Sequence, residues 1–309
     1  MFSCRQTVGA AAVAALFTIW NPYSAEACAC GCGVFSVSTP HMFPKGSGGT
    51  LSLEWDYMNQ DQNWHGTSRA PAANNDDKRI RTNFYTARLQ YMVNRTWGYD
   101  VQVPYWSRSF DTDVGGGDVE AYNHAAIGDV RLMGIYTGFS ADMSTGLTFG
   151  VKLPTGSHTL SGMDRDTQIG TGSTDALFGV FHRDRFVAHP HYMWSLDGKI
   201  DVPVLTVGGY RPGAEFNASA GLSHDPVPLG RGVKVAPFLQ LVNAYRLHDS
   251  GSAAPANTGY ERVLVTPGLE FSSGAETLDA DIGIPVYQNV RGNQLVAPVL
   301  FQVVLSHAF

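Results

Sequence analysis

Apolar and polar residues alternate with a period of two along most of this chain. In the segment 51–57, for example, Leu51 and Leu53 alternate with Ser52 and Glu54. Because successive side chains of a β-strand point to opposite faces, this pattern predicts strands with one apolar and one polar face. The segments with the clearest alternation are 51–57, 83–91, 99–105, 128–136, 146–153, 215–222, 261–270 and 278–284.

The apolar faces of these segments carry no charged side chains, and the connections between the segments alternate in length. A soluble β-sandwich would explain the alternation but neither the charge-free faces nor the sidedness of the loops. We therefore predict an all-β fold, a transmembrane antiparallel up-and-down β-barrel of about 12 strands with an N-terminal Cys-rich leader. Strands near 173–182, 186–196 and 232–243 alternate less cleanly, short turns are expected at 94–97, 183–185, 223–231 and 272–276, and long polar loops are expected at 58–78, 106–125, 154–170 and 245–258.

The first 27 residues have the features of an export signal. Arg5 precedes the apolar stretch 8–20, and Ala25 and Ala27 place small residues just before Cys28. The apolar stretch is shorter than the roughly 20 residues that a membrane-spanning helix needs. We therefore expect 1–27 to be a signal peptide, with an N-terminal structural helix as the alternative. Residues 28–48 are then expected to form a periplasmic leader or plug, and 49–309 the barrel.

The last strand of the chain ends in Phe309, with Leu305 and Phe301 at alternate positions before it. A C-terminal strand of this kind resembles the signature by which the barrel assembly machinery recognises outer-membrane barrels. We therefore expect a protein of the bacterial outer membrane. Its expected partners are outer-membrane lipid, a small-molecule or ion solute, and the assembly machinery during biogenesis.

The inward face of the predicted strands carries a mixture of acidic and basic side chains, with acids in excess. One interpretation is a polar lumen that binds or passes a small hydrophilic solute, with charged rings setting its selectivity. The other is a salt-bridged interior that closes a narrow barrel. The inward face shows no clear apolar track for a greasy substrate. The candidate lumen residues are Glu54, Asp56, Arg88, Asp100, Asp129, Arg131, Lys152, Asp175, Glu215, Lys234, Arg262, Glu270, Asp279 and Asp281.

The segment CACGCG at 28–33 places three thiols at every second position, in Cys28, Cys30 and Cys32. Clustered thiolates suit soft ions such as Cu(I), or Zn, and His41 is the nearest downstream candidate for a fourth ligand. A disulfide with one odd thiol is a second interpretation, since the periplasm is oxidising. A lipid on Cys28 is a third. The leader could fold into the barrel mouth or reach a periplasmic partner.

The formal net charge of −6 and the absence of basic clusters argue against nucleic acid as a partner. No set of Ser, His and acidic residues stands out on either strand face, so an enzyme is not expected.

Three stretches in the middle of the chain resemble a known family. IGDVRLMGIY, GLTFGVKLPTGS and IGTGSTDALFGVF, in that order, are similar to the outer-membrane proteins grouped as "MetA-pathway of phenol degradation" transporters. The resemblance is clearest over 127–182 and implies an outer-membrane transporter-like barrel.

Two functional hypotheses follow. The first is a channel or transporter for a small solute, coupled to soft-metal binding at the leader. The second is a closed barrel that anchors a leader docking a periplasmic metal or redox partner.

Overall fold

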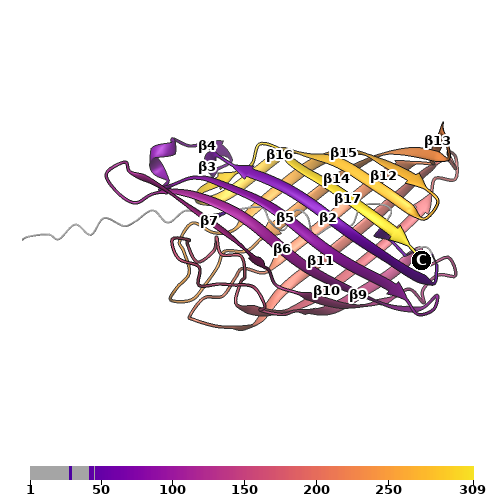
Figure 1. Cartoon of the computed structure of the whole chain (residues 1–309), viewed down its shortest axis with the longest axis horizontal. Coiled ribbons are helices and arrows are strands. Elements are labelled where there is room, and N and C mark those ends of the chain that lie inside the picture. Colours follow the sequence, from indigo (N-terminus) through magenta and orange to yellow (C-terminus); the bar gives the residue numbers. More distant parts are fainter. Residues whose placement is uncertain (1–27, 30–41, 45) are drawn as a thin grey trace, which may run out of the picture.

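Antiparallel strands close into a barrel in the computed structural model of the chain, which describes residues 28–29, 42–44 and 46–309 (Figure 1). The strands and the short 3-10 helix η3 have the following bounds: β1 (Cys28–Ala29), β2 (Gly48–Gln60), β3 (Gln62–Gly66), β4 (Ser68–Arg69), η3 (Ala72–Asn74), β5 (Asp77–Met92), β6 (Trp97–Asp113), β7 (Val119–Ile127), β8 (Arg131–Tyr136), β9 (Thr145–Lys152), β10 (Ser173–Arg185), β11 (Tyr192–Thr206), β12 (Glu215–His224), β13 (Val227–Gly230), β14 (Val233–Arg246), β15 (Tyr260–Ser273), β16 (Glu276–Val296) and β17 (Leu300–Ala308).

Within this described part, the barrel wall consists of twelve antiparallel strands, as predicted. β7 and β8 count as one strand of the barrel wall, because both pair with β6 and are separated only by residues 128–130. The remaining short strands pair with strands of the wall without being counted among the twelve. For example, β1 pairs in parallel with Gln294 and Leu295 of β16. In Figure 1 the C-terminus and β13 mark the end of the barrel with the shorter turns, here called the short-turn end. β3 and β4 lie at the opposite, long-loop end.

The barrel closes where its last strand, β17, pairs with its first, β2. Phe309 and Gly49 exchange backbone hydrogen bonds of 2.8 and 2.9 Å at the short-turn end of this seam. The ring of Phe309 lies over Gly49 so closely that a Cβ on that residue would sit 2.3 Å from the Phe309 Cζ atom. Glycine at this position therefore lets the terminal aromatic ring cover the seam.

The two faces of the strands separate as the sequence pattern predicted. On β2, Ser52, Glu54 and Asp56 are buried, whereas Leu51 and Leu53 are more than half exposed on the outer surface. Aromatic side chains gather on the outside near the short-turn end, where Tyr91 contacts both Tyr99 and Phe309, with ring centroids 5.7 and 6.4 Å apart. An apolar exterior flanked by aromatic residues is the surface expected of a barrel in lipid. Among the described residues, no helix has the length and apolarity to cross a membrane.

Four of the predicted connections are placed differently by the structure. The predicted loop 58–78 contains β3, β4 and η3, and the predicted turn 223–231 contains β13. The stretch 106–125 was expected to be a long loop, but β6 continues to Asp113 and β7 begins at Val119, which leaves only a short turn rich in glycine. This hairpin extends beyond the closed part of the wall, so its polar composition does not prevent strand pairing. The stretch 183–185 was expected to be a turn, but it completes β10, and the turn follows at 186–191.

The interior at the long-loop end contains a cluster of buried apolar residues, which the sequence pattern did not reveal, beside buried polar side chains such as Gln60 and Arg262. Met58, Phe84, Leu264 and Leu300 are buried there and pack with Ala297 from the connection between β16 and β17. Apolar residues inside a barrel are hidden from the period-two pattern when they are mixed with polar residues on the same face. Most of the charged candidates lie deeper along the lumen around the cavity, whereas Arg262 is buried beside the apolar cluster.

Candidate functional site

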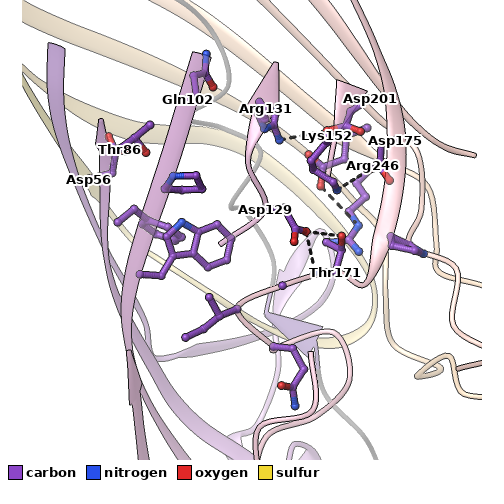
Figure 2. A pocket seen from close by; sticks show the side chains of 18 of the residues that line it. Asp56, Thr86, Gln102, Asp129, Arg131, Lys152, Thr171, Asp175, Asp201 and Arg246 are labelled. Atoms are coloured by element: carbon purple, nitrogen blue, oxygen red, sulfur yellow. Dashed lines mark hydrogen bonds and ion pairs between the residues drawn. The ribbon is translucent and has the colours of Figure 1, made fainter. Parts of the chain in front are cut away.

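A cavity of about 170 Å³ lies in the lumen beneath the apolar cluster. One part of its lining is apolar and aromatic, and the other part is charged. Figure 2 shows Arg131, Lys152, Asp175 and Arg246 gathered on one side, with Asp56 on the other. The ionisable residues that line the cavity are Glu54, Asp56, Arg88, Arg108, Asp129, Arg131, Lys152, Arg165, Asp166, Asp175, Lys199, Asp201, Glu215 and Arg246.

The charged side is built from ion pairs between different strands, two of them between paired strands and one, Arg131 with Asp201, across two intervening strands. Arg131 Nη2 of β8 lies 3.2 Å from Asp201 Oδ2 of β11, and Lys152 Nζ of β9 contacts Asp175 Oδ2 of β10. The Arg246 Nε atom of β14 lies 3.7 Å from Glu215 Oε1 of β12. Because each of these residues sits on the inward face of its strand, the barrel closure alone brings them together. The pairs offset the cost of keeping charges beside low-dielectric protein.

The opposite side of the cavity is acidic. Glu54 and Asp56 project from β2, and the amide of Gln302 on β17 donates to both, at 3.2 Å to Glu54 Oε1 and 2.9 Å to Asp56 Oδ1. Asp279 and Asp281 of the neighbouring β16 are buried beside them. Among the described residues, no ion pair involves Glu54, Asp56 or Asp281. The lumen is therefore charged asymmetrically, with carboxylates on the β16–β17–β2 wall and mixed charges on the wall across from it.

The loop 153–172 forms part of the cavity wall, because Asp129 holds both of its ends. Asp129 Oδ1 accepts a hydrogen bond from the Gly156 amide at 3.0 Å, and Oδ2 accepts from the Thr171 amide and hydroxyl at 2.8 and 2.6 Å. The two ends touch through glycine backbone, since a Cβ on Gly170 would meet the Gly156 oxygen at 2.2 Å. We call this segment the inward loop.

Arg165 on the inward loop reaches the cavity across the ring of Tyr210. Its Cζ atom lies 4.0 Å from the ring centroid, and its Nη2 atom donates to the Thr171 carbonyl at 2.6 Å. The Tyr210 hydroxyl in turn donates to Asp249 Oδ2 at 2.6 Å, and Arg246 Nη2 lies 2.8 Å from Asp249 Oδ1. Burial, with the nearby Asp249 carboxylate, raises the pKa of Tyr210 well above its usual range. The phenol therefore stays protonated and holds the stack in place.

The apolar side of the cavity is formed by Phe84, Pro104 and Trp106. The Phe84 and Trp106 rings meet edge to face, with centroids 4.8 Å apart. The Arg108 guanidinium lies 5.2 Å from the Trp106 ring centroid, and its Nε atom donates to Thr82 Oγ1 at 2.9 Å. Its Nη1 atom donates to the Thr167 carbonyl of the inward loop. Arg108 thus joins the aromatic wall to the inward loop.

Residues 42–44 occupy the lumen towards the short-turn end. Phe43 is buried against Phe181, with ring centroids 5.2 Å apart. The Met42 carbonyl accepts from Gln90 Nε2 at 3.1 Å, and the Pro44 carbonyl accepts from Arg183 Nη2 at 2.7 Å. Met42 also lines the cavity. We call residues 42–44 the stopper, because they lie between the cavity and the short-turn mouth.

The structure brings together part of the residue set proposed from sequence. Eight candidates line the cavity, namely Glu54, Asp56, Arg88, Asp129, Arg131, Lys152, Asp175 and Glu215. Asp279 and Asp281 lie behind the acidic wall, and Asp100 binds Arg88 Nε at 2.5 Å. Arg262 is fully buried near the long-loop end, where its Nη2 atom donates to the Ala297 carbonyl at 3.0 Å. Glu270 faces a separate hollow near the short-turn end, and Lys234 is exposed there.

The candidate metal ligands are not among the residues whose side chains the structure describes. Cys30, Cys32 and His41 lie outside the described residues, and only the backbone of Cys28 is placed. Within the described side chains, no group of three or more His, Cys, Asp or Glu residues could hold a metal ion.

Several cavity residues were missed from sequence. Lys199 and Asp201 continue an alternating inward set with Asp197 on β11, a signal that the irregular start of that strand obscures. Arg246 ends the inward set of β14. Arg165 and Tyr210 lie on loops, where no periodicity shows which way a side chain points.

No known protein-family profile matches the chain, and no curated protein sequence matches it. Among solved structures, the COG4313 outer membrane channel from Pseudomonas putida F1 is similar, with a TM-score of 0.64 and 12% identity over 88% of this chain and 100% of that chain. The β domain of the Bordetella autotransporter BrkA has a TM-score of 0.49 and 12% identity, over 85% of this chain and 100% of that chain. The P. putida toluene transporter TodX has a TM-score of 0.45 and 11% identity, over 93% of this chain and 96% of that chain.

At these identities the comparison shows the fold alone, and only the first structure is close enough to support an argument. The closed barrel of twelve strands, its apolar exterior and the fold that it shares with the COG4313 channel define the chain as a β-barrel of the bacterial outer membrane. Bacterial barrels of this kind have short periplasmic turns and longer extracellular loops. The short-turn end is therefore the periplasmic end, and the inward loop belongs to the extracellular side.

Proposed function

We propose that this barrel is a channel or transporter that carries a small solute across the outer membrane. The observation that supports this most directly is the cavity inside the lumen, which is lined by inward side chains of many different strands rather than by one loop. The apolar cluster above it and the charged walls around it offer a solute successive contacts of different chemistry. The proposed role is transport rather than catalysis, since most of the basic groups at the cavity are engaged in ion pairs and Asp129 holds the inward loop.

The test is ion conduction through the purified, folded protein in planar lipid bilayers. We expect discrete current steps that depend on insertion of the folded barrel. Heat-unfolded protein provides the control, since folded outer-membrane barrels migrate differently from unfolded chains in detergent gels. A folded barrel that inserts without passing any current, with or without the stopper intact, would contradict the proposal.

A second candidate function is a closed barrel that serves as an anchor for its N-terminal leader. It is favoured by the filled interior, because Phe43 is buried towards the periplasmic end and the cluster around Met58 and Leu300 fills part of the extracellular half. In this case 28–48 would dock a periplasmic metal or redox partner. The same bilayer experiment separates the two functions, since the anchor predicts no current.

Soft-metal binding at the leader is a further part of the first proposal. Thiolates of Cys28, Cys30 and Cys32 with the imidazole of His41 would suit Cu(I) or Zn. Bound metal should be measured in wild type and in a variant with all three Cys28, Cys30 and Cys32 changed to Ser. Stoichiometric metal that disappears in the variant would support the site, whereas a disulfide with one free thiol and no metal would contradict it.

A further inference from the structure

The cavity combines an apolar wall with basic side chains, and most of these basic side chains already have an acidic partner. Arg131, Lys152 and Arg246 pair with Asp201, Asp175 and Glu215 as described above. Arg88 pairs with Asp100, and Lys199 Nζ lies 3.9 Å from Asp197 Oδ1. These pairs leave little attraction for a second anion, because each positive charge is neutralised by its neighbour.

Arg165 is different. Among the described residues, no carboxylate lies within ion-pair distance of its guanidinium, on which Asp249, Asp129 and Asp166 act only from further away, and its Nη1 atom is buried without a hydrogen-bond acceptor. A buried donor without an acceptor costs about 1–3 kcal/mol, and more when the group is charged. Such a donor at the edge of a cavity is a site that an incoming acceptor would satisfy.

The orientation of Arg165 is fixed before any ligand arrives. Its planar face rests on Tyr210 at 4.0 Å, and its Nη2 atom is held by the Thr171 carbonyl. The inward loop that carries it is itself held by Asp129 and by Gln168, which donates to the Leu160 and Met163 carbonyls at 3.0 and 2.9 Å. A guanidinium fixed in this way presents a flat fork of donors, which matches the two oxygens of a carboxylate.

The rest of the cavity decides what else the solute must carry. Phe84, Pro104 and Trp106 offer an apolar wall, and a cavity of about 150 Å³ is known to hold a benzene-sized molecule, close to the 170 Å³ available here. Glu54 and Asp56 on the acidic wall would repel a carboxylate and so turn it towards the opposite side of the lumen.

We infer that the cavity binds a small carboxylate with an apolar body, whose carboxylate is received by the Arg165 guanidinium and whose body lies against Phe84 and Trp106. This inference rests on the proposed channel function and names its class of solute. Arg165 is then the residue that distinguishes an acid from a neutral compound of the same shape.

The test compares three probes of one size and different charge: benzoate, benzyl alcohol and benzylamine. Their binding to purified wild-type barrel in detergent should be measured by calorimetry. We expect benzoate to bind about tenfold more tightly than either analogue, which is the order expected for one charge-assisted hydrogen-bonded contact. Equal binding of all three would overturn the inference, and so would a preference for benzylamine, which would mean that the acidic wall governs the cavity.

The matched variants are Arg165→Gln at the site and Arg69→Gln on the exposed strand β4. Arg165→Gln should bind the three probes equally, whereas Arg69→Gln should keep the wild-type preference. A retained preference in Arg165→Gln would overturn the assignment of Arg165. Arg165→Lys is the second variant in case the first fails to fold. It keeps the charge and loses the fork, so benzoate affinity should fall several-fold, and an unchanged affinity would contradict the geometry.

The outcomes for site and channel are separable, because binding in detergent does not require conduction. A barrel that binds benzoate through Arg165 but passes no current would refute the proposed function and leave the site intact. A barrel that conducts ions but does not prefer benzoate would do the reverse.

Discussion

Asp225 lies on the periplasmic turn after β12 and joins two neighbouring turns through its carboxylate. Arg185 Nη1 donates to its Oδ1 atom at 2.7 Å, and His191 Nδ1 lies 3.3 Å from its Oδ2 atom. The hydrogen bond from Arg185, followed by that from His191 and the charge of Arg185, holds the pKa of Asp225 below its usual range. The side chain is partly exposed, so solvent and salt weaken these interactions.

A lowered pKa fixes the sign of the pH dependence. Because the folded carboxylate has the lower pKa, its stabilising contribution is complete above the unfolded value of about 3.9 and is lost as the pH falls below it. We therefore expect Asp225→Asn to lower the urea midpoint of unfolding slightly at pH 7, and this difference from wild type to shrink as the pH falls from about 4 through the lowered pKa of Asp225. The control is Asp118→Asn on the exposed turn between β6 and β7, which should have no effect at either pH. An Asp225→Asn effect that grows towards acid would contradict the assignment.

At the scale of elements, the inward loop depends on a single side chain at the break between β7 and β8. Asp129 accepts three hydrogen bonds from the two ends of the loop, and two of them go to the same oxygen. The loop positions Arg165 and Gln168 at the cavity. A change at Asp129 should therefore act on the loop and its side chains more than on the barrel wall.

We predict that Asp129→Asn loosens the inward loop. An amide has only one acceptor oxygen, so at least one loop donor would lose its partner, at a cost of about 1–3 kcal/mol. Faster cleavage between 153 and 172 by external protease on whole cells would report this loosening, with Asp118→Asn as the matched control. Cleavage at the wild-type rate, with the barrel folded, would show that the glycine contact between Gly156 and Gly170 is sufficient.

The strands were predictable from sequence for a physical reason, and the loops were not. A strand on the barrel wall faces lipid on one side and the lumen on the other, so each of its residues records its environment in its own polarity. The eight predicted residues that line the cavity follow from this alternation. Arg165 and Tyr210 belong to loops whose paths depend on distant partners such as Asp129 and Asp249. The depth of a residue along the lumen is likewise invisible in the pattern, which is why Arg262 and Glu270 were grouped with residues far from them.

At the scale of the whole molecule, the asymmetric charge across the lumen should determine which ions pass. Lys152 is buried on the mixed wall beside Asp175, and Lys234 is exposed near the periplasmic rim. Lys152→Glu would place a third acid beside Asp175 and Asp201, making the lumen more negative at the cavity. Lys234→Glu changes the net charge equally but outside the lumen.

We expect Lys152→Glu to raise the permeability ratio of K⁺ to Cl⁻ by about twofold or more, because charged rings in a narrow lumen act on passing ions at close range. Lys234→Glu should leave the ratio near that of wild type. The measurement is the zero-current potential across a bilayer in a KCl gradient, with folding checked by gel mobility. Equal shifts in both variants would show that the net charge of the protein, and not the lumen, sets selectivity.

The stopper gives a second prediction at this scale. Phe43 is buried against Phe181, Met92 and Ile135, so Phe43→Ala would remove a ring from the path between cavity and periplasm. We expect a larger single-channel conductance in Phe43→Ala than in wild type. Phe186→Ala is the control, since Phe186 is an exposed aromatic residue on a periplasmic turn. Unchanged conductance in Phe43→Ala would mean that the stopper does not limit the current.

The seam between β2 and β17 has a consequence for how the barrel comes into being. Ser52 and Ser306, whose hydroxyl oxygens lie 2.9 Å apart across it, are separated by 254 positions in the chain. Bringing such distant segments together costs chain entropy before the stabilising contacts can form. Folding that depends on contacts of this kind is therefore slow. Until β17 reaches β2, the growing sheet has two unpaired edges open to other chains. The barrel therefore needs a chaperoned, late closing step, and variants that weaken the seam should appear first as lower yield of assembled protein rather than as altered transport.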